Sequence, residues 1–483
     1  MSELLVELYG VTLGHLVGDA RSFDFLATPE AIEEFGLDSP VLSLAVPLAL
    51  IPLRSRRPRR QNFFAELLPE GPMATRLALQ AGVAPRDVPA MLRAYGRDVA
   101  GALQVWDPTA PGEPTTPAVE ALDEEGVADL LTHVAAVPLA NRPLGGKTSL
   151  AGVQPKIVLA RHEGGWARAI NGYPSSHILK PASKDYPSLI YDEEYGARLA
   201  RALGLTDRAD CPTTSGDGAP RTPRPASLAA LSAATEESAV SSTTWIETFA
   251  GVPALVIKRY DRVTPPAGDG AKAGLRRLHQ EDFNQILGAS GDQKYQKCGG
   301  LVSLARIARQ LAAIDAGSLE RLARPGVGCG GPPSPGGDAG SLERLARLTV
   351  LAVASGNLDL HAKNLSVLHY RDGTMTLAPA YDVAPQAHLP NDGELALAID
   401  GVYRHAAVTR AHLENELTTW GLAAPDEIVD TTLANVLETV EREIPHPLAY
   451  ANLRSDIARF TTNLIKGRPM GAERSHGPLG APR

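Results

Sequence analysis

The 483-residue chain is 44% hydrophobic and 21% charged, which is typical of a globular protein, and its length predicts two or three domains. Its formal charge of −8 argues against a general nucleic-acid coat and against a polybasic membrane anchor. The three cysteines show no metal-ligand spacing, and the N-terminus shows no leader pattern. The apolar runs are too short to cross a bilayer. These features predict a cytoplasmic protein without disulfides or membrane contacts.

The first hundred residues predict a small α/β unit. Two apolar runs, 4–9 and 11–17, flank a glycine and are typical of a β-hairpin. Residues 106–120 are rich in Pro and Thr, as interdomain linkers often are. We therefore assign residues 1–105 to an N-terminal subdomain and residues 106–128 to a linker.

Two further segments have the character of insertions. Residues 214–243 are rich in Ser, Thr, Ala and Pro and poor in large apolar residues, so we expect them to be disordered. The sequence DAGSLERLAR occurs at 315–324 and again at 338–347. Two copies are too few for a solenoid, so we interpret 315–347 as a local duplication whose extra copy loops out. The alternative is that the extra copy displaces the helix that follows it.

The most informative segment is 348–382, in which an apolar stretch leads into the polar loop DLHAKN and then into two β-like runs. Phosphoryl transfer needs a carboxylate that orients the acceptor hydroxyl, and an amide oxygen and a second carboxylate that hold magnesium. Asp359 and Asn364 have the Asp-x4-Asn spacing of protein kinases, and Asp382 follows the predicted hairpin. Lys363 is placed to neutralise charge on the transferred group. The alternative is a polar surface loop ahead of a hairpin.

A nucleotide also needs a phosphate loop and a charge partner. Residues 145–156 form a glycine- and hydroxyl-rich loop ahead of a predicted strand, and its backbone N–H groups could hold phosphates. Lys180 ends another short strand, and a helix over 192–203 follows with Glu193 and Glu194 in its first turn. Protein kinases pair a strand lysine with a helix glutamate. Glu194 is our candidate partner, although glutamate at a helix start also follows from the helix dipole.

Residues 253–262 predict a buried strand that ends at a polar edge, where a hinge between two lobes would contact adenine. Tyr260 could pack on the base and Asp261 could bond the ribose hydroxyls; the alternative is an ordinary strand end. Residues 280–282 (Gln-Glu-Asp) predict the capped start of a helix.

Together these motifs resemble the HipA family of serine/threonine kinases, the toxins of bacterial toxin–antitoxin modules. The resemblance covers nearly the whole chain apart from the two insertions and the tail. It rests on the sequences SLAGVQPK at 149–156, HILKP at 177–181, QED at 280–282, NLDLHAKNLS at 357–366 and YD at 381–382, with FFAELLPEG at 63–71 and YGRD at 95–98 in the N-terminal part.

The resemblance implies an α+β, two-lobed protein kinase-like fold with a small α/β N-terminal subdomain and a helical C-terminal lobe. Residues 129–262 would form the kinase N-lobe and hinge, and residues 263–467 the helical C-lobe. Residues 468–483 would be a disordered tail.

The resemblance also implies ATP and Mg²⁺ as cofactors. Asp359 would match the catalytic aspartate, Asn364 and Asp382 the magnesium ligands, and Lys180 the nucleotide lysine. The other implied nucleotide contacts are Ala151, Gly152, Val153, Gln154, Pro155 and Lys156 of the phosphate loop, Lys258, Arg259 and Tyr260 of the hinge with Asp261 beside them, His361, and Tyr381.

Regulation and partners are implied in the same way. Ser149 occupies the position that family members autophosphorylate, which disorders the loop and silences the kinase. Known targets in the family are aminoacyl-tRNA synthetases. A small helix-turn-helix antitoxin neutralises the kinase and binds operator DNA, so any DNA contact of this acidic chain would come through that partner.

The sequence departs from the family pattern at Lys258, where an acidic residue can occur, and at the two insertions. Two alternatives therefore stay open beside a serine/threonine protein kinase. One is a catalytically weak protein that acts with an antitoxin as a transcriptional co-repressor. The other is a small-molecule kinase on the same fold.

Overall fold

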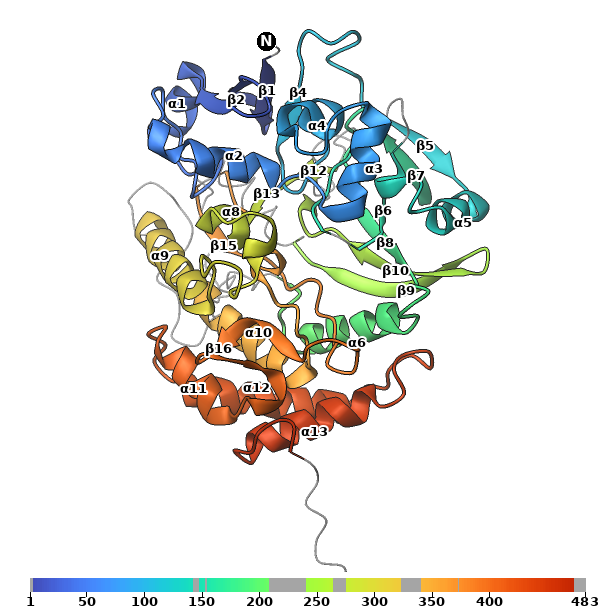
Figure 1. Cartoon of the computed structure of the whole chain (residues 1–483), viewed down its shortest axis with the longest axis vertical. Helices are drawn as coiled ribbons and strands as arrows, with labels where there is room; N and C mark the ends of the chain where they lie inside the picture. Colours follow the sequence, from blue (N-terminus) through green and yellow to red (C-terminus); the bar gives the residue numbers. More distant parts are fainter. Residues whose placement is uncertain are drawn as a thin grey trace, which may run out of the picture.

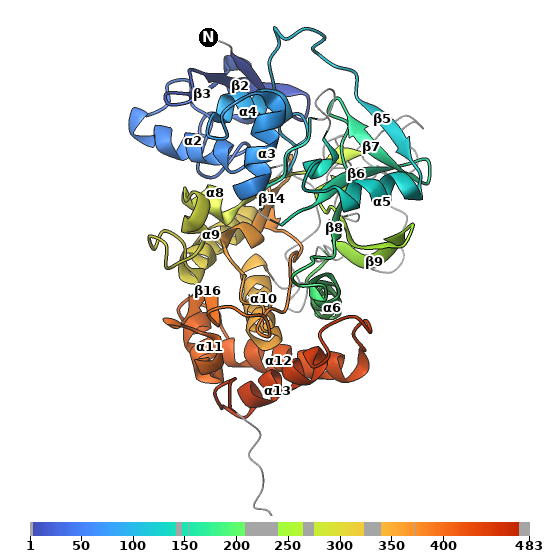
Figure 2. The same ribbon diagram turned by 45° about the vertical axis from the view of Figure 1, so that its right-hand side comes forward.

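The computed structural model describes residues 3–141, 147–152, 154–207, 240–263, 275–322, 340–371 and 373–472. Figure 1 shows two sheet-containing units side by side at one end of the molecule and a helical lobe at the other. Figure 2, turned by 45°, shows the same division, with helix α6 between the upper sheet and the helices below. None of the helices within these described ranges is long and apolar enough to cross a membrane.

The N-terminal unit is a four-stranded sheet with helices packed against it. The predicted hairpin is confirmed, because Leu4 pairs with Leu16 and Leu8 with Val11 in antiparallel register. Phe63 and Phe64 are fully buried in the same core. The strands, in the sheet order β3-β2-β1-β4, are β1 (Leu4–Leu8), β2 (Val11–Val17), β3 (Asp24–Ala27) and β4 (Gln104–Trp106), and the helices are α1 (Pro29–Phe35), α2 (Arg57–Ala65), α3 (Gly71–Ala81) and α4 (Val88–Tyr95).

A six-stranded antiparallel sheet forms the second unit. Helix α5 (Glu124–Thr132) packs on the face that carries Leu179 and Val256, and α6 (Leu189–Ala202) packs on the face that carries Leu255 and Ile257. Because side chains alternate along a strand, these two helices cover opposite faces. The strands, in the order β5-β7-β6-β8-β10-β9, are β5 (Ala118–Leu122), β6 (Ile157–His162), β7 (Gly165–Ile170), β8 (His177–Pro181), β9 (Thr243–Phe249) and β10 (Val252–Lys258).

The helical lobe contains the largest core. Its α10, α12 and α13 pack together, and a small sheet of order β13-β14-β15 joins them to the upper units. The predicted hairpin before Asp382 is confirmed as β14–β15, and Asp282 caps α8 as predicted, since its side chain accepts from Gln285 N. The remaining elements are β11 (Arg262–Val263), β12 (Arg276–Arg277), β13 (His279–Asp282), α8 (Phe283–Leu287), α9 (Leu304–Leu322), α10 (Ser341–Ser355), β14 (Ser366–His369), β15 (Met375–Leu377), β16 (Glu394–Ile399), β17 (Val402–Arg404), α11 (Arg410–Thr418), α12 (Pro425–Arg442) and α13 (Leu453–Ile465).

Three predicted boundaries need correction. Residues 106–128 are not all linker, because β5 pairs with β7 at the sheet edge and α5 begins at Glu124. The predicted disordered tail begins too early, since Met470 is fully buried and its carbonyl accepts from Asn463 Nδ2 at 3.0 Å. The predicted insertion 214–243 ends too late, because Val240 is buried and β9 starts at Thr243; residues 214–239 lie outside the described residues.

The duplicated segment divides between two helices. Residues 315–322 of the first copy continue α9, and Ser341 of the second copy begins α10. Asp315 of the first copy caps α10, because its carboxylate accepts from Ser341 N and Leu342 N at 3.3 and 3.1 Å. The helix ahead of the segment DLHAKN (359–364) is therefore built by the second copy, and residues 323–339 lie outside the described part.

Candidate active site

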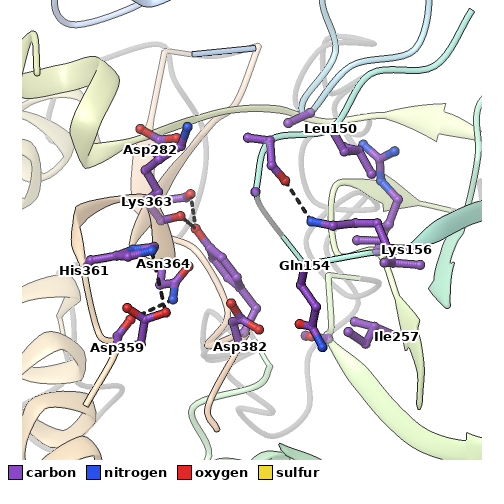
Figure 3. Close-up of a pocket in the computed structure, with 18 of the residues that line it drawn as sticks. Leu150, Gln154, Lys156, Ile257, Asp282, Asp359, His361, Lys363, Asn364 and Asp382 are labelled. Atoms are coloured by element: carbon purple, nitrogen blue, oxygen red, sulfur yellow. Dashed lines mark hydrogen bonds and ion pairs between the residues drawn. The ribbon is translucent and has the colours of Figure 1, made fainter. Parts of the chain in front are cut away.

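A cavity of about 480 Å³ lies where the N-terminal unit, the six-stranded sheet and the helical lobe meet. Figure 3 shows its two walls. One wall carries Asp359, His361, Lys363 and Asn364 from the segment after α10, and the other carries Leu150, Gln154, Lys156 and Ile257 from the sheet side; Asp382 lies between them. The structure thus brings together residues that are more than 200 positions apart in the sequence.

The segment DLHAKN is held by its own polar side chains. Helix α10 ends at Gly356, whose φ of 73° favours glycine, and a Cβ there would lie 2.8 Å from Ala387 Cβ. Asn357 Oδ1 accepts from Asp359 N at 3.1 Å, and Asn364 Nδ2 donates to Asp359 O at 2.9 Å. Both hydrogen bonds fix the backbone of Asp359, and the second leaves the amide oxygen of Asn364 as its available ligand atom.

The carboxylate of Asp359 lies in a polar but partly desolvated setting. Burial, and then the nearby charge of Asp382, raise the pKa of Asp359 to about 6. Tyr295 donates its hydroxyl proton to Asp359 Oδ1 at 3.2 Å, and His361 Nε2 lies 3.9 Å from the other oxygen. Burial lowers the pKa of His361 to about 4, so that its ring is neutral at pH 7.

Lys180 joins the two walls. It ends β8, and its Nζ contacts Glu193 Oε1 at 2.7 Å, Glu193 Oε2 at 3.0 Å and Asp382 Oδ1 at 2.6 Å. Burial alone would lower the pKa of Lys180, but the two carboxylates raise it above its ordinary value. The glutamate partner is Glu193 and not Glu194 as expected. One residue along a helix turns the side chain by about 100°, which directs Glu194 to Arg198 Nε at 2.9 Å.

The predicted phosphate loop closes the opposite side of the cavity. Lys156 is buried, and its Nζ donates to Ala151 O at 2.8 Å. Burial, and then the charge of Lys180, lower the pKa of Lys156 to about 8. Gly152 has a φ of 111°, and a Cβ there would lie 2.6 Å from Lys156 Nζ, so the loop needs glycine at this point. Gln154 lines the cavity and Pro155 is exposed, whereas Val153 lies outside the described residues.

Ser149 stands at the start of this loop and is fully buried. Its hydroxyl donates to Leu67 O at 2.9 Å, and its amide donates to Asp98 O at 2.9 Å. The loop is therefore tied to the N-terminal unit at two points. Lys147, two residues earlier, forms an ion pair with Glu113.

The segment after β10 only partly fulfils the hinge prediction. Lys258, Arg259 and Tyr260 line the cavity, and the Tyr260 ring packs 5.5 Å from the Tyr381 ring. Asp261 also lines the cavity, and its expected ribose contact stays a prediction. Its carboxylate is buried and already accepts from Arg259 Nη2 at 2.7 Å, Arg262 Nη1 at 2.9 Å and Gly101 N at 2.7 Å. No motif pattern could show that these two arginines, one adjacent to Asp261 and one two residues before it, would fold back onto it.

Lys363 also differs from the expectation. Its Nζ was expected to face a transferred phosphate, but it contacts Glu66 Oε2 at 2.7 Å and Glu70 Oε1 at 2.5 Å. Lys294 Nζ binds the other oxygen of Glu70 at 3.1 Å. Sequence patterns did not identify Glu66, Glu70, Lys294 or Tyr295 as members of this contact network. FFAELLPEG at 63–71 is a motif of the family resemblance, but nothing in its spacing indicates that its glutamates reach residues 359–364.

The chain matches two family models, the HipA N-terminal domain over residues 4–106 and the HipA-like C-terminal domain over residues 148–444. The chain belongs to the HipA family. It is 31% identical over 356 residues to the putative kinase Y4mE of Sinorhizobium fredii, covering 72% of this chain and 69% of that relative. It is 26% identical over 414 residues to the serine/threonine-protein kinase toxin HipA of Shewanella oneidensis, covering 83% of this chain and 82% of that protein.

A solved structure of Shewanella oneidensis HipA with HipB and its operator DNA superimposes with a TM-score of 0.66 at 21% identity. The superposition covers 96% of each chain. The predicted fold class is thereby confirmed as an α+β, two-lobed kinase-like fold, and kinase-named relatives indicate that the family binds nucleotides in general. The cavity between the lobes combines carboxylates, an amide oxygen and lysines, which are groups suited to a phosphate-bearing ligand with a divalent cation.

Proposed function

We propose that this HipA-family protein is an ATP-dependent serine/threonine protein kinase that acts in the cytoplasm. One observation carries the proposal: Asp359, Asn364, Asp382 and the Lys180–Glu193 pair all face a single cavity between the two lobes. These are the residue types that a kinase needs for the acceptor hydroxyl, the metal and the phosphates.

ATP would bind with its base near the segment after β10 and its phosphates between the loop and Asp382. Ile257, Lys258 and Tyr260 line the first part of the cavity, and Lys156 and Lys180 the second. Lys180, oriented by Glu193, would hold the α- and β-phosphates. Lys156, whose partner is a backbone carbonyl at 2.8 Å, supplies a second positive charge on the side of the loop.

The residues present fit a magnesium ion. Mg²⁺ prefers oxygen ligands and commonly takes one or two carboxylates, with the rest of its octahedron from phosphates and water. Asp382 is kept ionised because Lys180 lowers its pKa, against the effect of burial, and Asn364 has its amide nitrogen committed to Asp359 O. Bound there, the metal would neutralise phosphate charge.

Asp359 would orient the acceptor. The serine or threonine oxygen attacks the γ-phosphorus, the bond from that phosphorus to the β-phosphate oxygen breaks, ADP leaves, and Asp359 accepts the hydroxyl proton. With its pKa raised to about 6 by burial, Asp359 is ionised at pH 7 and yet basic enough to accept a proton.

We also propose that Ser149 is the autophosphorylation site. Its hydroxyl is buried and bound to Leu67 O, a position with no room for a phosphate and with a carbonyl that would repel it. Phosphorylation would therefore require the loop to leave the cavity. That displacement would remove Gln154 and Lys156 from the nucleotide, which accounts for silencing.

The proposed partners are inferred from the relatives. The Shewanella oneidensis HipA structure is a complex with HipB and operator DNA. We propose a helix-turn-helix antitoxin of that kind for this chain, with DNA contacted through the antitoxin because the chain itself carries a formal charge of −8. An aminoacyl-tRNA synthetase is the proposed protein substrate, by analogy with the family.

The test is phosphate transfer by the purified full chain with labelled ATP and Mg²⁺, with the labelled residue mapped. Asp359→Asn and Asp382→Asn are run in parallel and checked for folding by thermal unfolding. We expect label on Ser149 in the wild type and none in either variant. Label in the folded variants would refute the proposed roles. If the wild type binds ATP without transferring phosphate, the co-repressor alternative is favoured. If it transfers phosphate only to small molecules, the small-molecule kinase alternative is favoured.

A further inference from the structure

The turn between α2 and α3 of the N-terminal unit reaches into the catalytic lobe. Glu66 follows α2, Glu70 precedes α3, and both carboxylates bind the ammonium group of Lys363. These two residues and Lys363 are almost 300 positions apart. The side chains of Glu66 and Lys363 are 6% and 5% exposed, so solvent screens this contact little.

The two glutamates are themselves held in place. Glu66 Oε1 accepts from Gly291 N at 3.1 Å, and Glu66 Oε2 accepts from Asn284 Nδ2 at 3.0 Å. Glu70 Oε2 is bound by Lys294 at 3.1 Å. Burial alone would raise the pKa of Glu70, but the charges of Lys363 and Lys294 lower it to about 2. Lys363 thus binds two carboxylates that the groups around them also hold, and Glu70 is ionised at neutral pH.

The backbone of Lys363 connects this contact to the proposed catalytic groups. Lys363 is followed directly by Asn364, whose side chain fixes the backbone of Asp359. The carbonyl of Lys363 accepts the hydroxyl proton of Tyr381 at 2.7 Å, and Tyr381 directly precedes Asp382. A displacement of Lys363 would therefore move all three groups that a kinase needs for the metal and the acceptor.

We propose that Glu66 and Glu70 are positioning residues for phosphate transfer. Through Lys363, the N-terminal unit holds the catalytic segment in register. Lys363 is in this view an anchor and does not bind the transferred phosphate. The inference rests on the proposed kinase function for its activity readout, but the position of the segment can be measured without activity.

The competing reading is that Lys363 leaves the glutamates and binds phosphate when the nucleotide arrives. The two readings differ in a double-substitution experiment. If Lys363 is an anchor, its removal already breaks the contact, so removing Glu70 as well adds nothing. If Lys363 instead bound phosphate, releasing it from Glu70 would preserve or raise transfer, and Lys363→Met would be harmful by itself.

The experiment uses the full chain with Glu70→Gln, Lys363→Met and the double variant, together with Glu70→Asp, which retains the charge. Glu414→Gln is the matched control, because Glu414 also pairs with a basic side chain, that of Arg410, but lies on α11 outside the cavity lining. Transfer is measured as kcat and as KM for ATP. Hydrogen–deuterium exchange over residues 356–366 is measured on the same samples.

We expect kcat to fall about 100-fold in Lys363→Met, the cost of a misplacement near 1 Å, with little change in KM for ATP. Glu70→Gln should lose less, because Glu66 still contacts Lys363 at 2.7 Å. The double variant should be no worse than Lys363→Met, Glu70→Asp should recover part of the rate, and exchange over 356–366 should rise in all but the control. Multiplying losses in the double variant, or unchanged exchange, would overturn the proposal. If the wild type transfers no phosphate, the proposed function fails, and the exchange result alone decides whether the anchor exists.

Discussion

The ammonium group of Lys180 lies 2.6 Å from Asp382 Oδ1 and 2.7 Å from Glu193 Oε1. One lysine therefore joins strand β8, helix α6 and the segment after β15 across the cavity. A magnesium ion bound to Asp382 would compete with Lys180 for the same carboxylate. In the proposed complex, Asp382 would hold the metal and Lys180 the phosphates, while Glu193 would keep Lys180 in place.

The first prediction distinguishes the two adjacent glutamates of α6. Glu193→Gln removes a buried partner of Lys180, so we expect kcat/KM for ATP to fall about tenfold, the scale of one charge-assisted hydrogen bond. Glu194→Gln removes only the ion pair with Arg198 and should leave kcat/KM close to that of the wild type. Steady-state transfer assays on both variants check this. Equal losses would show that α6 acts through its overall charge.

The Lys180–Glu193 pair also shows what the sequence could and could not predict. The lysine, its strand and the helix that supplies the glutamate follow from residue type and spacing. The choice between Glu193 and Glu194 depends on how α6 rotates against Leu255 and Ile257, which only packing decides. A spacing rule therefore finds the helix but not its facing residue.

Other differences have the same physical origin. The sequence did not predict the short strand β5, which lies in a Pro- and Thr-rich segment. The hydrogen bonds to β7 at the sheet edge stabilise this strand, and no local pattern shows them. Asp261 has the residue type of a ribose ligand, but two arginines and Gly101 N occupy its carboxylate. The contact of Glu66 and Glu70 with Lys363 joins segments that no local pattern connects.

The second prediction concerns pH. Burial and the charge of Asp382 raise the pKa of Asp359 to about 6, and only the ionised carboxylate can accept the proton of the acceptor. The rate of transfer should therefore rise from pH 5 to pH 7 with a midpoint near 6 and level off above it. A pH–rate profile of kcat at saturating ATP checks this. A flat profile across this range would show that Asp359 is not the titrating base.

The same shift gives a stability effect with a definite sign. The pKa of the Asp359 carboxyl is higher in the folded protein, about 6, than its ordinary value of 3.8. The free energy of unfolding therefore falls as the pH rises from about 4 to about 6, and the loss is complete above that range. Asp359→Asn removes that loss, so we expect this variant to be more heat-stable than the wild type at pH 7.5. The gain should shrink at pH 5, where the folded carboxyl is mostly protonated. Thermal unfolding at both pH values measures it.

The third prediction concerns Ser149. Ser149→Asp places a charge against Leu67 O in a fully buried site, so we expect the loop to leave its position and the affinity for ATP to fall. Ser149→Ala loses one hydrogen bond, worth about 1 kcal/mol, and should bind ATP nearly as the wild type does. Calorimetric ATP titration, with hydrogen–deuterium exchange over residues 147–156, tests both variants. Equal affinity and exchange in the two variants would remove the basis for silencing through this loop.

The fourth prediction concerns the duplication. Asp315 caps the amides of Ser341 and Leu342, at the place that Asp338 would take if the chain held one copy. Deleting residues 315–337 puts Asp338 directly after Ile314, so one aspartate can still end α9 and cap α10. We expect a folded protein with activity equal to or above that of the full chain. In the full chain, Asp315→Ala should lower the free energy of unfolding by about 1 kcal/mol through loss of the cap. A large drop in the melting temperature of the deletion variant would instead show that the first copy contributes stability that one aspartate cannot replace.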